Sequence, residues 1–199
     1  LRKEALTSML SSNVDIMIRT LLLILSFAFF ADQSARYGEV ILASNHLLLQ
    51  LVSFAAFFLD GYAFVVEALV GKARGAGRVG LFRLAVFRST VLAAATAGML
   101  ALLLVFGGTA LIALLTDIDA VREASVPMLG FAAVYVAVSF AAFQLDGIFI
   151  GLSATREMRN ASIHSIVVYF VAWTLLAPAF GVAGLWAAMI IYVIARAAA

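Results

Sequence analysis

The sequence contains no cysteine. Disulfide bonds, cysteine-based zinc sites and cysteine nucleophiles are therefore excluded. Histidine is also scarce, and its two positions, His46 and His164, fit neither a His-x-x-Glu nor a His-Glu-x-x-His motif. We therefore expect no metal site. A Gly-x-Ser-x-Gly motif, which marks many serine hydrolases, is missing as well, so we expect no enzyme.

Charged residues make up only 12% of the 199 residues, and hydrophobic residues make up 65%. A soluble domain has about 25% charged and about 45–50% apolar residues. The hydrophobic residues stand in long blocks, and the basic residues fall mainly in short segments between them. Although the isoelectric point is near 9.2, this pattern predicts an integral membrane protein and no nucleic-acid partner.

Six membrane spans are predicted, because about 20 mostly apolar residues cross the roughly 30 Å hydrocarbon core. They cover residues 13–31, 40–70, 81–115, 124–153, 161–179 and 182–195. An interruption of the third span is expected at Gly107-Gly108. Backbone groups in hydrocarbon must bond within the segment, so the spans should be helices. The predicted fold class is all-α, a polytopic transmembrane helix bundle.

The positions of lysine and arginine predict how the chain crosses the membrane. With a cytoplasmic amino terminus, ten of them lie on or near the inner side: Arg2, Lys3, Lys72, Arg74, Arg78, Arg83, Arg88, Arg156, Arg159 and Arg196. Only Arg36 and Arg122 lie outside, and Arg19 lies within the first span. We therefore expect a multi-pass protein of the cell (inner or plasma) membrane with both termini in the cytoplasm.

One octapeptide occurs twice. Phe54–Gly61 reads FAAFFLDG and Phe140–Gly147 reads FAAFQLDG, so seven of eight positions match. Both copies lie on spans that run from outside to inside, which should place Asp60 and Asp146 at similar depths. An internal repeat and a chance match in a sequence rich in Phe and Ala both explain it.

A polar stripe follows one face of the second span. Steps of four and three residues join His46, Gln50, Ser53, Phe57, Asp60, Phe64 and Glu67. Ionisable groups are costly in a membrane, so the stripe should line the bundle interior or a cavity. Asp60 is the leading candidate to bind and release a coupling proton; its alternative role is a hydrogen bond to a neighbouring helix.

The stripe holds two further ion-coupling candidates and a cavity candidate. Glu67 either couples ions or pairs with Lys72 or Arg74 near the inner interface. His46 either joins a proton path or is a helix-end histidine near the outer interface. Gln50 is expected to line the cavity between them.

Asp146, Asp15 and Arg19 are the other charged residues predicted in the membrane interior. Asp146 is a coupling candidate, but Gly147 and Gly151 follow it as a GxxxG pair, which lets helices approach closely and favours a packing role equally. Asp15 and Arg19 stand four residues apart, with the acid first, so an ion pair within one helix is predicted.

Three stretches resemble the multidrug and toxic compound extrusion (MATE) transporters, and more closely their DinF branch. They are NVDIMIRTLLL (Asn13–Leu23), LDGYAFVVEALVGKARGAGR (Leu59–Arg78) and LDGIFIGLSATREMRN (Leu145–Asn160). The resemblance implies that residues 1–199 form one six-helix lobe, the carboxy-terminal half of a twelve-helix transporter whose amino-terminal lobe is absent from this sequence.

The resemblance also implies an activity. Such transporters alternate between inward-open and outward-open states and exchange organic cations or amphipathic compounds for H+ or Na+. The implied partners are a small cationic or amphipathic substrate, membrane lipid and an amino-terminal lobe of the same or another chain. No cofactor is expected besides the coupling ion. In the DinF-like branch, coupling is often assigned to an aspartate of the amino-terminal lobe, which leaves the roles of Asp60, Glu67 and Asp146 open.

Two alternatives remain. A lipid or polysaccharide flippase of the same superfamily should have a large cationic cavity, but Arg19 is the only arginine predicted in the membrane interior, since Arg83 and Arg88 are assigned to the inner side. A non-transporting assembly subunit would gain nothing from acidic residues along the second span. Aromatic residues crowd the second and fourth spans, where they either form a wall for bulky solutes or pack against lipid.

Overall fold

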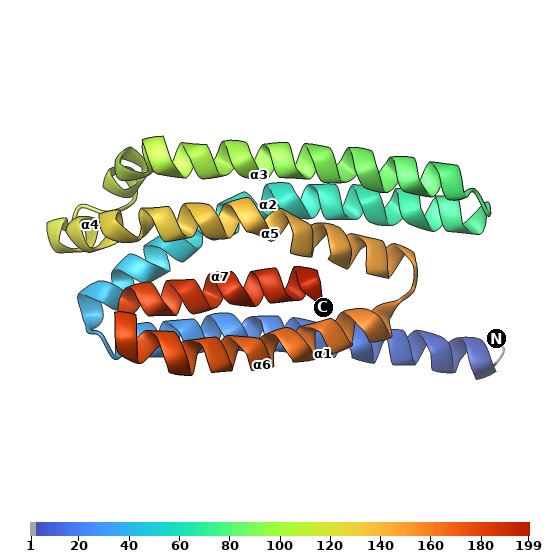
Figure 1. Ribbon diagram of the computed structural model, residues 1–199, viewed down its shortest axis with the longest axis horizontal. Helices are drawn as coiled ribbons and strands as arrows, with labels where there is room; N and C mark the ends of the chain where they lie inside the picture. The colour runs from blue at the N-terminus through green and yellow to red at the C-terminus, as the bar shows by residue number, and fades with distance from the viewer. Residues whose placement is uncertain (1–2) are drawn as a thin grey trace.

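The computed structural model describes the backbone of residues 3–199 and the side chains of residues 9–199. This part of the chain is helical, as predicted (Figure 1). The elements are α1 (Lys3–Ala35), α2 (Glu39–Gly75), α3 (Val79–Leu115), α4 (Asp119–Ser125), the 3-10 turn η1 (Val126–Met128), α5 (Leu129–Gly151), α6 (Thr155–Phe180) and α7 (Val182–Ala198). Arg2 and Lys3, two of the predicted inner cations, lie outside the described side chains.

Five helical stretches are long and apolar enough to cross a membrane. They are Met9–Ala35, Glu39–Gly75, Val79–Leu115, Asp119–Gly151 and Thr155–Phe180, and the shorter apolar helix Val182–Ala198 follows them. These stretches correspond to the six predicted spans, with α4, η1 and α5 together forming the fourth. The chain is therefore a multi-pass membrane protein.

The interruption predicted at Gly107-Gly108 is wrong, because α3 continues without a break to Leu115. Glycine is tolerated in membrane helices, where the bilayer favours an unbroken helix. At Gly108, the absence of a side chain lets α3 pack closely against Leu129 of α5. An added Cβ would lie 2.6 Å from Cδ2 of Leu129 on α5, so a larger residue would displace that side chain.

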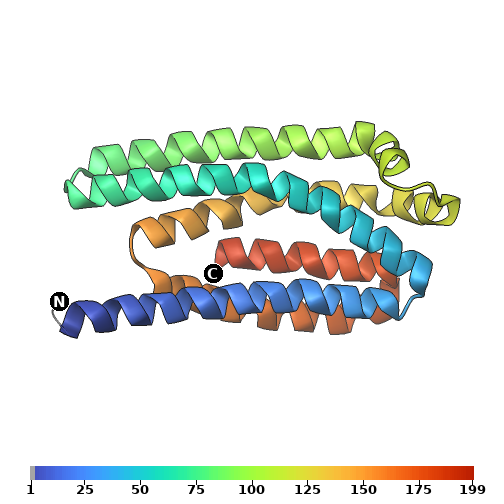
Figure 2. The same ribbon diagram turned by 180° about the vertical axis from the view of Figure 1, so that it is seen from behind.

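The helices form two groups. α2, α3 and α5 pack on one another, α1 and α7 each pack against α6, and α5 joins the groups through its contact with α7. Figures 1 and 2 show these groups as an upper and a lower layer of nearly parallel and antiparallel helices. Gly181 is the single residue between α6 and α7, and its φ of 59° favours glycine.

The GxxxG pair on α5 brings this helix close to α2, as predicted. An added Cβ at Gly147 would collide with the carbonyl oxygen of Ala63, and one at Gly151 would lie 2.6 Å from the carbonyl oxygen of Glu67. Since α2 and α5 run in the same direction, the level of Gly147 is about 3 Å beyond that of Gly61. The two copies of the octapeptide therefore lie side by side at nearly the same depth.

A buried polar network ties α1, α2 and α7 together where α1 ends and α2 begins. Asn45 donates a 2.8 Å hydrogen bond to Oγ of Ser34 and accepts one of 3.0 Å from the indole nitrogen of Trp186. Nearby, Ser125 of α4 donates to Ser44 of α2 at 2.9 Å. Because these buried groups are paired, their hydrogen bonds offset the cost of desolvation while the network fixes the helices.

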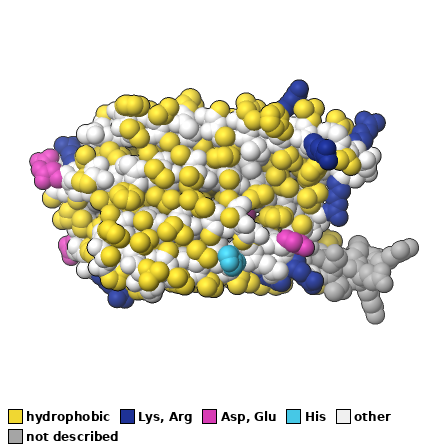
Figure 3. Space-filling model, viewed as in Figure 1, with side chains coloured by type: hydrophobic (Ala, Val, Ile, Leu, Met, Phe, Trp, Pro, Cys, Tyr) yellow, Lys and Arg dark blue, Asp and Glu magenta, His cyan; other side chains and the backbone are white. Residues whose placement is uncertain are grey.

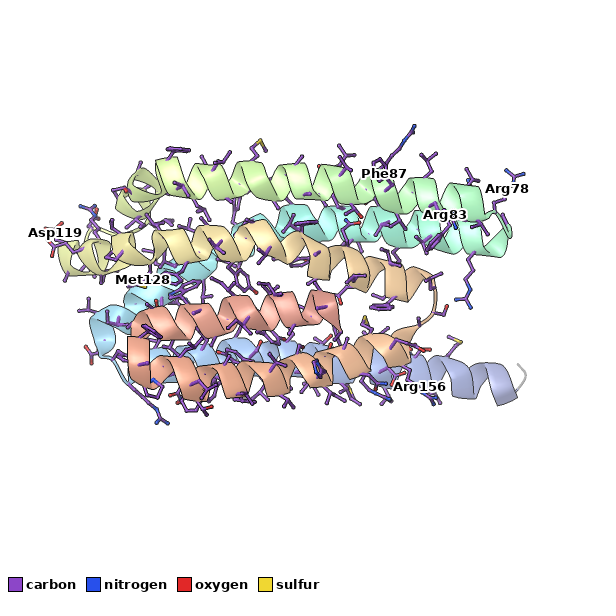
Figure 4. All side chains as sticks on the ribbon, viewed as in Figure 1. Arg78, Arg83, Phe87, Asp119, Met128 and Arg156 are labelled. Carbon is purple, nitrogen blue, oxygen red and sulfur yellow. The ribbon has the colours of Figure 1, made fainter. Side chains whose placement is uncertain are left out.

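The two ends of the bundle differ in charge. We call the end with the turns at residues 76–78 and 152–154 the basic end. Arg78, Arg83 and Arg156 lie there, whereas Asp119 lies at the opposite end (Figure 4). Lysine and arginine gather mainly at the basic end, and the flank between the ends is largely hydrophobic (Figure 3). This is the asymmetry behind the predicted orientation; which end faces the cytoplasm stays a prediction.

The two copies of the octapeptide offer a matched test of the α2–α5 contact. Gly147→Ala should lower the free energy of unfolding by about 1–3 kcal/mol, because the added methyl group overpacks the contact with Ala63. Among the described residues, nothing lies within 4 Å of a Cβ added at Gly61. Gly61→Ala should therefore be neutral or stabilise by up to about 1 kcal/mol through helix propensity.

Thermal unfolding of the two variants in the same detergent, followed by circular dichroism, measures this difference. Equal melting temperatures for Gly61→Ala and Gly147→Ala would contradict the close packing of α5 on α2.

Candidate functional site

A cavity of about 290 Å³ lies between α1, α2, α5 and α7 and is open to the outside of the chain. Six polar or charged residues line it: Arg19, Ser53, Asp60, Tyr135, Ser139 and Arg196. Six hydrophobic residues complete the wall: Leu23, Phe27, Val52, Ala56, Phe57 and Phe143. Four separate helices therefore bring two cations, one carboxylate and three phenyl rings to one concave surface.

Two arginines beside this cavity share one carboxylate. Arg19 of α1 and Arg196 of α7 both donate to Oδ2 of Asp146 on α5, and the bond from Arg196 is 2.6 Å long. The side chains of Arg196 and Asp146 are only 6% and 14% exposed. A carboxylate held by two guanidinium groups in so buried a place joins three helices electrostatically.

Arg196 was expected on the inner side of the membrane, and this placement is wrong. α7 has only 17 residues and ends partway along the bundle (Figure 1). Its last turn therefore brings Arg196 to the depth of Asp146 rather than to the basic end. The guanidinium also lies 5.9 Å from the ring centroid of Tyr192, one turn earlier on the same helix.

The predicted ion pair between Asp15 and Arg19 is also wrong, because each residue finds its partner on another helix. Asp15 is 4% exposed. It accepts a 2.6 Å bond from Arg159 and a 3.1 Å bond from the hydroxyl of Thr155, both on α6. Packing of α1 on α6 brings these groups to Asp15. Together they satisfy both oxygens of the carboxylate.

Asp60 differs from Asp146 in having no ionic partner. Within the described part of the chain, no lysine or arginine nitrogen lies within 4.0 Å of its carboxylate. It is half-buried and lines the cavity together with Ser53 and Phe57, which share its face of α2. The central part of the predicted stripe therefore does face a cavity, and Asp60 is a free carboxylate within it.

The ends of the stripe lie elsewhere. Gln50 lines a separate, almost entirely apolar pocket of about 340 Å³ between α2 and α3. His46 is exposed, and Glu67 is half-buried. Neither is in the lining of the 290 Å³ cavity, and among the described side chains Glu67 forms no ion pair with Lys72 or Arg74. The stripe diverges because α2 passes different neighbours along its length.

Several cavity residues escaped the sequence analysis. The sequence predicts Arg196 on or near the inner side and gives no role to Tyr135. A signal for Tyr135 was present, since Tyr135, Ser139 and Asp146 follow helical spacing along one face of α5. One feature stays unexplained: both amide atoms of buried Gln144, which replaces Phe58 of the other octapeptide, have no hydrogen-bond partner among the described residues.

Comparison with known protein families identifies the family of this chain. The family model described as MatE matches residues 16–175. The chain belongs to the MatE family. The matched region holds Arg19, Asp60 and Asp146, whereas Arg196 lies beyond it. The family resemblance seen in the sequence is thereby confirmed.

One curated relative in this family is the DNA damage-inducible protein F of Escherichia coli (strain K12). It is 36% identical over 192 residues, which cover 94% of this chain and 41% of that protein. The chain thus spans well under half the length of this relative. That the chain corresponds to the carboxy-terminal lobe remains a prediction.

The two aspartates of the octapeptide should differ sharply in their effect on stability. Asp146→Asn removes the carboxylate that binds the partly buried Arg19 and the buried Arg196 and should lower the free energy of unfolding by about 3 kcal/mol. Asp60→Asn breaks no ion pair and should change it by less than about 0.5 kcal/mol. Thermal melting of both variants in detergent measures the contrast, and a smaller loss for Asp146→Asn than for Asp60→Asn would refute the shared ion pair.

Proposed function

We propose that the chain is part of a secondary transporter that exports cationic or amphipathic compounds in exchange for H+, with Asp60 as the proton-binding group. Members of the MatE family are transporters. The observation that carries the proposal is the unpaired carboxylate of Asp60 in a cavity between four helices. An unpaired acid within a membrane span is costly, which points to a use in the working cycle.

The charges around the cavity give this exchange a physical basis. With Asp60 and Asp146 ionised, two carboxylates balance Arg19 and Arg196, so the site is neutral. Asp146 is already held by both arginines, which leaves Asp60 as the carboxylate available to a cationic substrate. Protonation of Asp60 gives the site a net charge of +1 and removes that counter-ion. A proton and an organic cation therefore compete for one group, as an exchanger requires.

The wall of the cavity suits bulky amphipathic solutes. Phe27, Phe57 and Phe143 present aromatic surface from α1, α2 and α5. Phenyl faces attract organic cations and bury apolar area without demanding a particular hydrogen-bond pattern. This breadth fits a substrate class rather than a single compound. In the proposed transporter, an amino-terminal lobe of the same or another chain forms the opposite wall, and alternating access moves the two lobes apart on each side in turn.

The flippase alternative gains little from the cavity. The cavity holds two arginines rather than the single arginine expected from the sequence, but both bind Asp146, and Asp146 and Asp60 together balance their charge when both carboxylates are ionised. A site for a phosphorylated lipid or polysaccharide carrier needs surplus positive charge. The ionised cavity has none, so the exporter explains the charges better than a flippase does.

Export assays with a fluorescent cationic dye test this proposal. An efflux-deficient bacterium would express the chain together with an amino-terminal lobe, either wild type or with Asp60→Asn. Asp60→Asn should reduce export at least about tenfold, because an amide neither binds a proton nor neutralises a cation. Glu67→Gln is the matched control: it removes an acid of the same helix outside the cavity and should retain export.

Membrane vesicles separate the two possible coupling ions. A pH gradient alone should drive dye uptake into inverted vesicles, and a Na+ gradient alone should not. Full export by Asp60→Asn would place coupling outside this chain. Absence of export by a folded wild-type protein would favour the flippase or the non-transporting subunit.

A further inference from the structure

A second concave surface lies on the flank of the bundle, away from the charged cavity. It is a groove of about 440 Å³ between α2 and α3 near the basic end. Its walls include Val65, Leu69, Leu81, Leu84 and Leu92, which are 43–56% exposed. α3 lies at the edge of the bundle (Figure 1). The groove therefore opens sideways, where the surroundings of a membrane helix are lipid.

The polar groups on the floor of this groove are already paired. The hydroxyl groups of Tyr62 and Thr96 bond each other at 2.9 Å, and Ser89 donates a 3.3 Å bond to the backbone carbonyl of Tyr62. The floor therefore offers a ligand mainly hydrocarbon surface. An acyl chain fits such a surface, whereas a polar solute would lose its hydrogen bonds to water there.

Two cations line the same groove. Lys72 and Arg88 are both exposed, and no aspartate or glutamate oxygen among the described side chains lies within 4.0 Å of either. The bond from Ser89 to Tyr62 sets Arg88 near the level of Tyr62, about 15 Å deeper along α2 than Lys72. An arginine so deep on a lipid-facing flank needs a counter-ion, and long basic side chains reach toward the membrane surface to find one.

We propose that this groove binds an anionic phospholipid. The phosphate lies between Lys72 and Arg88, and an acyl chain runs along the leucine-lined floor toward Leu92. This arrangement supplies the negative charge that the protein lacks and covers the exposed hydrophobic wall. Anionic lipids are concentrated in the cytoplasmic leaflet, the side predicted for the basic end. The proposal concerns lipid binding and does not depend on transport.

Quenching by brominated lipids tests the site directly. A tryptophan placed in the groove by Leu92→Trp reports the lipid beside it. The fluorescence of Trp173 and Trp186 is measured in the protein without this change and subtracted. The purified protein would be reconstituted with mixtures of brominated phosphatidylglycerol and phosphatidylcholine. Each cation near the surface contributes about a fivefold preference for an anionic lipid, so phosphatidylglycerol should be preferred at least about fivefold.

Charge removal inside and outside the groove provides the control. In the Leu92→Trp background, Lys72→Gln with Arg88→Gln should abolish the preference. Arg78→Gln with Arg83→Gln removes the same charge from the same end (Figure 4), but neither residue lines the groove, so the preference should remain. Lys72→Gln alone, an exposed change near a helix end, should lower it about fivefold and serves if the double variant does not fold.

Three results would overturn the proposal. Equal loss in both double variants would show a general attraction to the basic end rather than a site. An equal affinity for both lipids in the protein with Lys72 and Arg88 intact would show that the groove does not recognise an anionic headgroup. Absence of quenching by either lipid would mean that protein, such as another lobe, covers the groove.

Discussion

The carboxylate of Asp146 holds the arrangement of charges on which the candidate site depends. Arg19 and Arg196 come from opposite ends of the chain, and both would be costly in a membrane without a counter-charge. By accepting bonds from both, Asp146 connects α1, α5 and α7 around one cavity. The same pairing occupies the arginines and leaves Asp60 as a free acid. Structure and proposed chemistry thus rest on one ionic cluster.

The two octapeptides show how neighbouring helices decide what a motif does. Both place an Asp-Gly pair at nearly the same depth on helices that run in the same direction. On α5, Gly147 lies against the backbone of α2 and Asp146 is bound by two arginines. On α2, Gly61 faces open space and Asp60 is unpaired. Near-identical sequence has become a packing element in one copy and a candidate ion-binding element in the other.

Hydrophobic blocks were enough to predict the helices, because a membrane leaves the backbone few alternatives. The GxxxG spacing likewise predicted the close approach of α5, and the face of α2 around Asp60 followed from helical periodicity. Ionic partners could not be predicted in this way. The spacing of Asp15 and Arg19 suggested a local pair, but each has a better partner on a neighbouring helix. The depth of Arg196 depends on where α7 sits within the bundle, which its own residues do not reveal.

The length of α2 and α3 has a mechanical consequence. Each has 37 residues, or about 55 Å, which a hydrocarbon core of about 30 Å cannot enclose even at a tilt of 40°. At least one end of each helix must therefore extend beyond the hydrocarbon core, and the basic residues around the hairpin favour that end. Asp60 lies about 24 Å along α2 from the turn at residues 76–78. The hairpin is thus a rigid lever, and a small rotation of α2 at the cavity becomes a larger displacement of its tip at the membrane surface.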